Sequence, residues 1–121
     1  MPIAAIAGWG LLALPGADRA DGFPATGGGV TIKNMEFQPR VIHIGAGELV
    51  RWVNADVANH QVSTGTVDGR RPRPGGRVSS PLLFRGDEFA AAFRNAGVYP
   101  YYCAVHPFMR GLVVVAQEEA P

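Results

Sequence analysis

The 121-residue chain is 47% hydrophobic and 9% aromatic, which suffices for one packed domain and excludes a disordered chain. Its 16 glycines and 10 prolines follow no period, so a collagen-like repeat is excluded as well. Eleven basic and ten acidic residues leave a net charge of +1, which argues against a strongly basic protein that binds nucleic acid.

The N-terminal part of the chain differs from the rest. Residues 3–14 form an apolar run that is too short to span a bilayer as a helix, and small and turn-forming residues follow it. This pattern predicts a secretory signal peptide over residues 1–20 and hence export to the periplasm; a docked N-terminal helix or strand is the alternative. We expect a flexible lead-in at 21–29, one folded domain at 30–116 and a polar tail at 117–121, with no membrane span in the mature chain.

The remaining sequence shows the alternation of strands rather than the periodicity of a helix. Short apolar segments are separated by turn signals, most of which contain glycine. The predicted strands are Val30–Ile32, Val41–Ile44, Leu49–Asn54, Gln61–Ser63, Leu82–Arg85, Phe89–Phe93, Val98–Ala104 and Leu112–Ala116. The second and third of these resemble a pair of strands joined by the glycine turn at 45–47. Seven to eight short strands predict an all-β fold, a Greek-key β-sandwich.

Three metal-binding side chains lie close together just before the last predicted strand, in the pattern Cys103-x-x-His106-x-x-Met109. Thiolate and thioether sulfurs are soft donors that favour copper(I), and imidazole serves both oxidation states of copper. Cys103 is the only cysteine, so an intramolecular disulfide and a two-cysteine metal site are both excluded. Taken alone, the pattern could also be a chance combination of a buried cysteine, a surface histidine and a core methionine.

A fourth donor strengthens the hypothesis of a metal site. His60 lies far upstream, between two predicted strands whose connection can reach the same end of a sandwich. With His106 and Cys103 it could form a trigonal plane of two histidines and one cysteine, and Met109 would be the weak axial ligand of a blue-copper site. We expect His43 to face solvent, and Met35 lies on another segment, so neither is a predicted ligand.

The region 30–116 resembles a cupredoxin of the plastocyanin/azurin class. The loop at 103–111, CAVHPFMRG, most resembles that of amicyanin, with two residues between cysteine and histidine and two between histidine and methionine. Further residues that carry the resemblance are Phe37, Pro39, Ile42, Ile44, Gly47, Val50, Trp52, Asn54, Asp56, Val62, Ser79, Ser80, Pro81, Leu82, Leu83, Gly86, Phe89, Phe93, Gly97, Tyr99 and Tyr101. Gln61 follows His60 where the family commonly has an asparagine that ties the two ligand loops together, which leaves the hydrogen bonds around Cys103 open.

The resemblance implies a type 1 copper protein that shuttles single electrons between periplasmic redox partners and is not an enzyme. One copper ion per chain, alternating between Cu(I) and Cu(II), would be held by His60, Cys103, His106 and Met109. Resemblance to amicyanin implies a quinoprotein amine dehydrogenase as electron donor and a c-type cytochrome as acceptor, and we expect a monomer. A copper carrier or storage protein without a redox circuit is the alternative; an oxidase or nitrite reductase would need a second copper site that His43 cannot supply by itself.

Two further features concern partners. Pro107 and Phe108 are predicted to form an apolar collar around a partly exposed His106, where a redox partner docks; the alternative is that Phe108 packs into the core. The segment at 64–77 carries four arginines, Arg70, Arg71, Arg73 and Arg77. A solvated and mobile loop is the favoured interpretation of this segment, and steering toward an acidic partner is the alternative.

Overall fold

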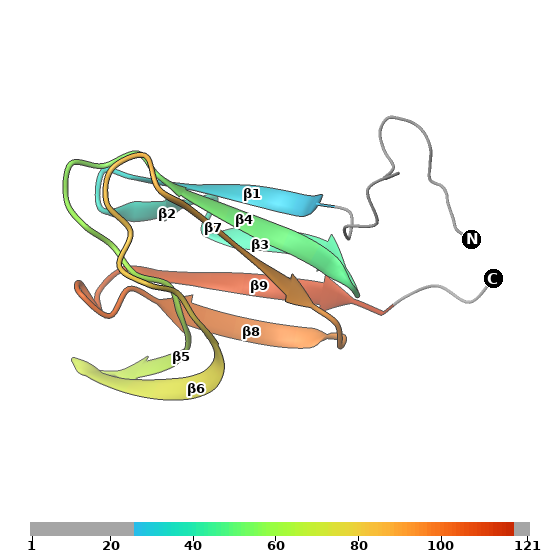
Figure 1. The fold of residues 1–121 in the computed structure, drawn as a ribbon. Coiled ribbons are helices and arrows are strands. Elements are labelled where there is room, and N and C mark those ends of the chain that lie inside the picture. The colour runs from blue at the N-terminus through green and yellow to red at the C-terminus, as the bar shows by residue number, and fades with distance from the viewer. Residues whose placement is uncertain (1–25, 118–121) are drawn as a thin grey trace.

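The computed structural model describes residues 26–117, and every element of regular structure in them is a strand (Figure 1). Nine strands are formed, where the sequence predicts seven to eight. They are β1 (Thr26–Lys33), β2 (Glu36–Gln38), β3 (Val41–Gly45), β4 (Glu48–Asn54), β5 (Ser63–Asp68), β6 (Arg71–Ser79), β7 (Glu88–Phe93), β8 (Gly97–Tyr102) and β9 (Arg110–Ala116). None of the described residues forms a helix that could cross a membrane. The predicted signal peptide lies outside the described residues.

The strands form two sheets that pack face to face, which confirms the predicted β-sandwich. One sheet has the order β2-β1-β4-β7 and the other has the order β3-β9-β8-β5-β6. The pairs β1–β4 and β3–β9 are parallel, and the remaining neighbours are antiparallel. The turn between β3 and β4 therefore carries the chain from one sheet to the other and does not join a hydrogen-bonded pair, contrary to the prediction for these two segments.

Several elements differ from those predicted, and three of the differences bear on the architecture. β1 begins at Thr26, so part of the predicted lead-in is a strand that pairs with β4. The predicted strand at 82–85 is reduced to one bridge between Leu83 and His60. The segment predicted as a mobile loop instead holds most of β5 and β6, which pair with each other as a hairpin. β6 lies at a sheet edge, where prolines and glycines that would disrupt a central strand are tolerated.

The core is built from the inward faces of both sheets, as the alternation of apolar residues requires. Its centre is Trp52, which is fully buried and lies 5.4 Å from Tyr101 in an edge-on arrangement. The other buried aliphatic and aromatic side chains of the cluster are Val30, Ile32, Phe37, Ile42, Ile44, Val50, Val62, Val78, Leu83, Phe93, Val113 and Val115. This packing supports the end of the sandwich at which the connections after β4, β6 and β8 meet, which we call the copper end after the ion that the sequence predicts there.

Candidate metal centre

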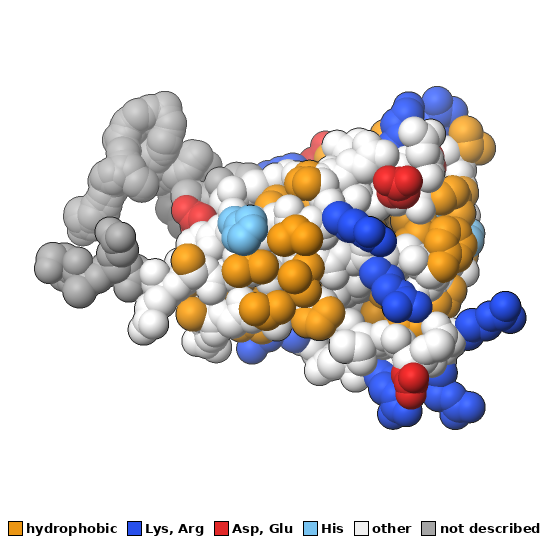
Figure 2. Space-filling model, turned by 180° about the vertical axis from the view of Figure 1, so that it is seen from behind, with side chains coloured by type: hydrophobic (Ala, Val, Ile, Leu, Met, Phe, Trp, Pro, Cys, Tyr) orange, Lys and Arg blue, Asp and Glu red, His pale blue; other side chains and the backbone are white. Residues whose placement is uncertain are grey.

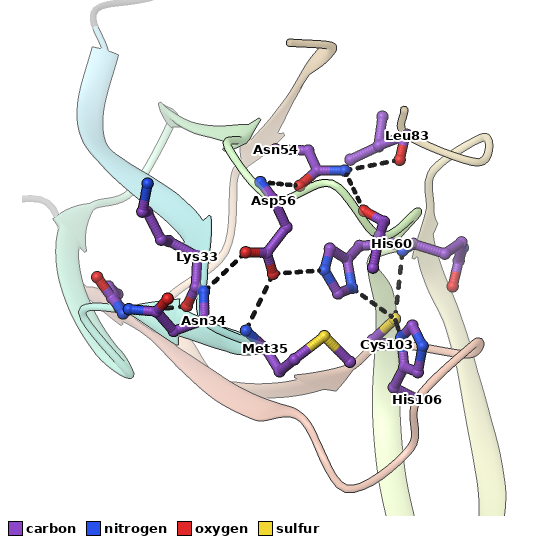
Figure 3. A network of polar contacts seen from close by, with 12 residues as sticks. Lys33, Asn34, Met35, Asn54, Asp56, His60, Leu83, Cys103 and His106 are labelled. Atoms are coloured by element: carbon purple, nitrogen blue, oxygen red, sulfur yellow. Dashed lines mark hydrogen bonds and ion pairs between the residues drawn. The ribbon is translucent and has the colours of Figure 1, made fainter. Parts of the chain in front are cut away.

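Three of the four predicted ligands meet at the copper end, from two connections far apart in the sequence (Figure 3). The Sγ atom of Cys103 lies 3.8 Å from Nδ1 of His60 and 3.8 Å from Nδ1 of His106. The three donor atoms all lie within 4.8 Å of one another. Cys103 and His60 are fully buried, whereas His106 is partly exposed. The donors therefore form a compact triangle with one corner open toward solvent.

The triangle has the size that a trigonal metal site requires. An ion bound about 2.0 Å from nitrogen and about 2.3 Å from sulfur, distances typical of zinc sites, separates these donors by about 3.7 Å at trigonal angles. The observed separations from sulfur to nitrogen match this value. A thiolate with two imidazoles and a nearby thioether is a soft set that suits copper in both oxidation states. The residues present fit a mononuclear copper ion.

Met109 lies at the end of the same loop and is 2% exposed. Its backbone N–H donates to the carbonyl of His106 at 2.9 Å, and its own carbonyl accepts the N–H of Cys103 at 3.1 Å. These two bonds close the loop into a tight turn, so the cysteine, histidine and methionine are held together by the backbone as well as by packing. Met109 is thus buried on the same closed loop as Cys103 and His106, and its thioether would be the fourth donor available to a bound ion.

The orientation of His60 is set by Asp56, four residues earlier in the connection between β4 and β5. Nε2 of His60 lies 2.9 Å from Oδ2 of Asp56. A carboxylate only accepts hydrogen bonds, so Nε2 carries the ring proton and Nδ1 is left with a lone pair facing the sulfur. A carboxylate behind a ligating histidine fixes its tautomer and its ring orientation, as is common in metal sites.

Asp56 also holds the turn between β1 and β2. Its carboxylate accepts the backbone N–H groups of Asn34 at 2.8 Å and Met35 at 2.9 Å. Both residues adopt left-handed backbone conformations, with φ values of 55° and 59°, which are uncommon outside glycine. Burial raises the pKa of Asp56, but the hydrogen bonds from Met35, His60 and Asn34 outweigh it and hold that pKa below its ordinary value of 3.8.

Asn54 is fully buried and stabilises the connection that presents His60. Its amide nitrogen donates to the carbonyls of Ala58 at 3.0 Å and Leu83 at 2.9 Å, and its side-chain oxygen accepts the N–H of Asp56 at 2.9 Å. The His60 backbone pairs in both directions with Leu83. The histidine is thus fixed before any metal arrives.

Gln61 ties the two ligand-bearing connections together, which settles the question that its replacement of the usual asparagine raised. Its backbone N–H points at the Cys103 sulfur from 3.4 Å. Its side-chain oxygen accepts the N–H of Ala104 at 3.4 Å and the hydroxyl of Ser63 at 2.8 Å, while its amide nitrogen donates to the carbonyl of Ser80 at 2.9 Å. The longer glutamine side chain therefore bridges three segments around the thiol.

Sequence reasoning did not assign roles to Asp56 or to the Gln61 side chain, although both positions had been noted. The spacing of four residues between Asp56 and His60 was the available signal. Met35 was set aside as a ligand, yet its side chain extends from the β1–β2 turn toward His60 and Cys103 (Figure 3). Met35 lies near the site because Asp56 holds the β1–β2 turn in place. The spacing of these residues in the sequence does not reveal this contact.

The surface over the site is apolar. Phe108 is 65% exposed, and its ring centroid lies 6.1 Å from that of His106. The alternative in which Phe108 packs into the core is therefore wrong. Four other large apolar side chains are exposed on the connections that meet at the copper end, namely Val57, Leu82, Phe84 and Val105. As predicted, His43 is exposed and lies on β3, away from the ligands.

A family model described as copper binding proteins, plastocyanin/azurin family, matches residues 25–116. This match covers the two sheets and all four predicted ligands. The chain belongs to this family. It is 32% identical over 113 residues to amicyanin-alpha of Methylorubrum extorquens, covering 93% of this chain and 92% of that protein. It is also 33% identical over 87 residues to amicyanin of Paracoccus denitrificans, covering 71% of this chain and 63% of that protein.

Solved structures agree with this assignment. A purple cupredoxin from Nitrosopumilus maritimus superposes with a TM-score of 0.65 at 31% identity, covering 74% of this chain and 99% of that chain. A reduced tryptophan-to-tyrosine mutant of amicyanin superposes with a TM-score of 0.61 at 30% identity, covering 73% of this chain and 80% of that chain. The protein is thus a cupredoxin similar to the amicyanins, its cofactor is copper, and it is a blue copper electron-transfer protein.

Proposed function

We propose that this cupredoxin shuttles single electrons between periplasmic redox partners through one copper ion held by His60, Cys103, His106 and Met109. The observation that carries the proposal is the donor triangle, in which one sulfur stands 3.8 Å from each of two imidazole nitrogens. Bound copper supplies a one-electron couple. The chain supplies a fixed donor set, which limits the rearrangement that accompanies each electron.

Each ligand is held by its own network of hydrogen bonds. Asp56 fixes the ring of His60, Gln61 donates to the sulfur of Cys103, and the backbone turn fixes His106 against Met109. Because these contacts lie outside the donor triangle, they can hold the side chains in the same place whichever charge the ion carries. The burial of Cys103 also excludes water and protects its thiolate from oxidation.

Partners are proposed to dock over His106, on the apolar collar of Pro107 and Phe108. The imidazole of His106 is the part of the donor set nearest to solvent, so it offers the shortest route for an electron to a docked protein. A small apolar contact suits a brief redox encounter, which buries little area. Such a patch lets either partner leave quickly after transfer.

The similarity to amicyanins supports a quinoprotein amine dehydrogenase as electron donor and a c-type cytochrome as acceptor. The apolar run at residues 3–14 supports a signal peptide at 1–20, and the same relatives support a periplasmic location. We propose that the protein acts as a monomeric carrier and not as an enzyme.

The test is copper titration of the purified protein followed by voltammetry. An intense visible absorption from thiolate to copper(II), saturating at one copper per chain, and rapid reversible reduction are expected. His60→Ala should abolish the absorption, whereas the matched change His43→Ala on the exposed face of β3 should leave it intact. Easy loss of copper together with slow electron exchange would instead select the carrier or storage function.

A further inference from the structure

The β5–β6 hairpin leaves its sheet and projects at the copper end. β5 pairs with β8 only at Ser63 and Thr64. At Gly65 the chain bends with a φ of 139°, and a Cβ at this position would collide with the carbonyl of Arg73 on the other strand of the hairpin. Beyond this bend the two strands pair only with each other, and their turn points in the same direction as the ligand loop (Figure 1).

Arg110 links the hairpin turn to the ligand loop. Its Nη2 donates to the carbonyl of Gly69 in the hairpin turn at 3.1 Å. Its Nε donates to the carbonyl of Pro107, beside the ligand His106, at 3.4 Å. One guanidinium therefore bridges the hairpin and the ligand loop, so the turn and the apolar collar form neighbouring parts of one surface.

The hairpin is strongly basic. Residues 63–79 contain four arginines and a single acidic residue, Asp68, which pairs with Arg73 at 3.1 Å. Arg77 stacks over the ring of Tyr99 at 5.1 Å. The exposed Arg70 and Arg71 directly follow Gly69, the residue of the hairpin turn that Arg110 links to the ligand loop. Figure 2 shows hydrophobic side chains gathered at the end that faces right, with Lys and Arg side chains around them.

From this arrangement we propose that the basic hairpin selects a redox partner that carries an acidic surface next to its apolar contact patch. This inference rests on the proposed electron-transfer function. Phe108 and its apolar neighbours supply the short-range contact, while Arg70 and Arg71 steer the partner and set its orientation. A second copy of this chain is a poor occupant because it would bring the same positive charges together.

The test uses two forms of one protein as probes: a basic c-type cytochrome and the same cytochrome after succinylation of its lysines. The two share a haem and a fold and differ in surface charge. In stopped-flow mixing with the copper-loaded protein at low salt, we expect electron exchange with the acidic form to be about tenfold faster than with the basic form. The difference should shrink as added salt shortens the screening length.

A pair of charge-matched variants locates the effect. Arg70→Gln with Arg71→Gln should reduce the rate with the succinylated cytochrome about threefold to fivefold and remove much of its salt dependence. The control, Arg94→Glu, lowers the net charge by the same amount in the turn between β7 and β8, away from the copper end. It should leave the rate within about twofold of the parent.

The proposal is overturned if both cytochrome forms react at the same rate, or if the two variants slow the acidic form equally. The hairpin would instead be assigned to a lipid surface by a different result. In that case the parent, but not the hairpin variant, binds vesicles of equimolar phosphatidylcholine and phosphatidylserine, and the cytochrome rates are unchanged. A protein with no thiolate-to-copper absorption and no reversible reduction would fail as an electron carrier, whereas a blue and reversible protein without charge selectivity would defeat this inference alone.

Discussion

Among the polar groups that hold the copper ligands in place, the carboxylate of Asp56 is the one whose substitution we expect to cost the most stability. It accepts three hydrogen bonds, from His60 and from the backbone N–H groups of Asn34 and Met35. Asp56→Asn keeps the shape of the side chain but replaces one acceptor oxygen with a donor. Whichever way the new amide is turned, its NH₂ faces at least one N–H group, so at least one bond is lost and a donor is set against another donor.

The magnitude follows from the bonds that are lost. A hydrogen bond to a charged group contributes about 1.5 to 3 kcal/mol, so losing one or two of them should lower the free energy of unfolding by about 1.5 to 6 kcal/mol. The matched control is Asp87→Asn, because Asp87 accepts one backbone N–H, that of the exposed Phe84, which an amide oxygen can still accept. We expect the control to cost about 1 kcal/mol or less.

The assay is urea denaturation of the copper-free protein, followed over a range of pH. The pKa of Asp56 is lowered in the folded state, so its contribution is complete above the ordinary value of 3.8 and is lost as the pH falls through the lower folded value. The difference in free energy of unfolding between the parent and Asp56→Asn should therefore stay constant above pH 3.8 and disappear as the pH falls below it. Equal costs for the two variants, or a difference that does not disappear in acid, would refute the assigned role.

Three further predictions concern separate parts of the molecule. Gln61→Ala should lower the free energy of unfolding by about 1 to 3 kcal/mol and shift the visible absorption, because the glutamine side chain bridges Ser63 and Ala104 beside the thiol. Equilibrium unfolding and absorption spectra check this, and an unchanged spectrum would contradict it. Phe108→Glu should slow electron exchange with redox partners without removing copper. Val98→Glu, which changes a side chain that is 61% exposed on β8, should leave the exchange rate unchanged. Stopped-flow rates and copper content test this, and equal rates for the two variants would contradict the docking role of Phe108. Burial raises the pKa of Tyr101 from 10.0 to about 12, opposed by the nearby Trp52 indole, so its contribution to stability is present below pH 10.0 and lost as the pH rises toward 12. Alkaline unfolding of the parent and of Tyr101→Phe should show this, and a parallel response of the two proteins above pH 10.0 would count against it.

The central features of the site could be read from the sequence because they depend on covalent spacing. Cys103, His106 and Met109 lie on one short connection, so they must stay near one another whatever the rest of the chain does. The alternation of apolar residues likewise fixes the fold class, since one face of each strand has to be buried. These inferences need only local geometry and the chemistry of the donor atoms.

Other features depended on how distant segments pack. β6 was missed because its prolines and glycines lower strand propensity, and only its place at a sheet edge makes a strand of it. The glycine turn at 45–47 was expected to close a strand pair, but β3 finds its partner in β9, at the far end of the sequence. Propensity and spacing carry no information about such partners.

The sequence by itself determined which side chains can bind a metal, which metal suits them, and that strands present them. Only the tertiary structure decided that His60 lies beside Cys103 and that Asp56 and Gln61 orient the donors. It also decided that Phe108 and the basic hairpin share one surface. The physical reason is that these contacts, apart from the one between Asp56 and His60, join residues separated by long stretches of chain. Their formation depends on the packing of two whole sheets rather than on any short segment.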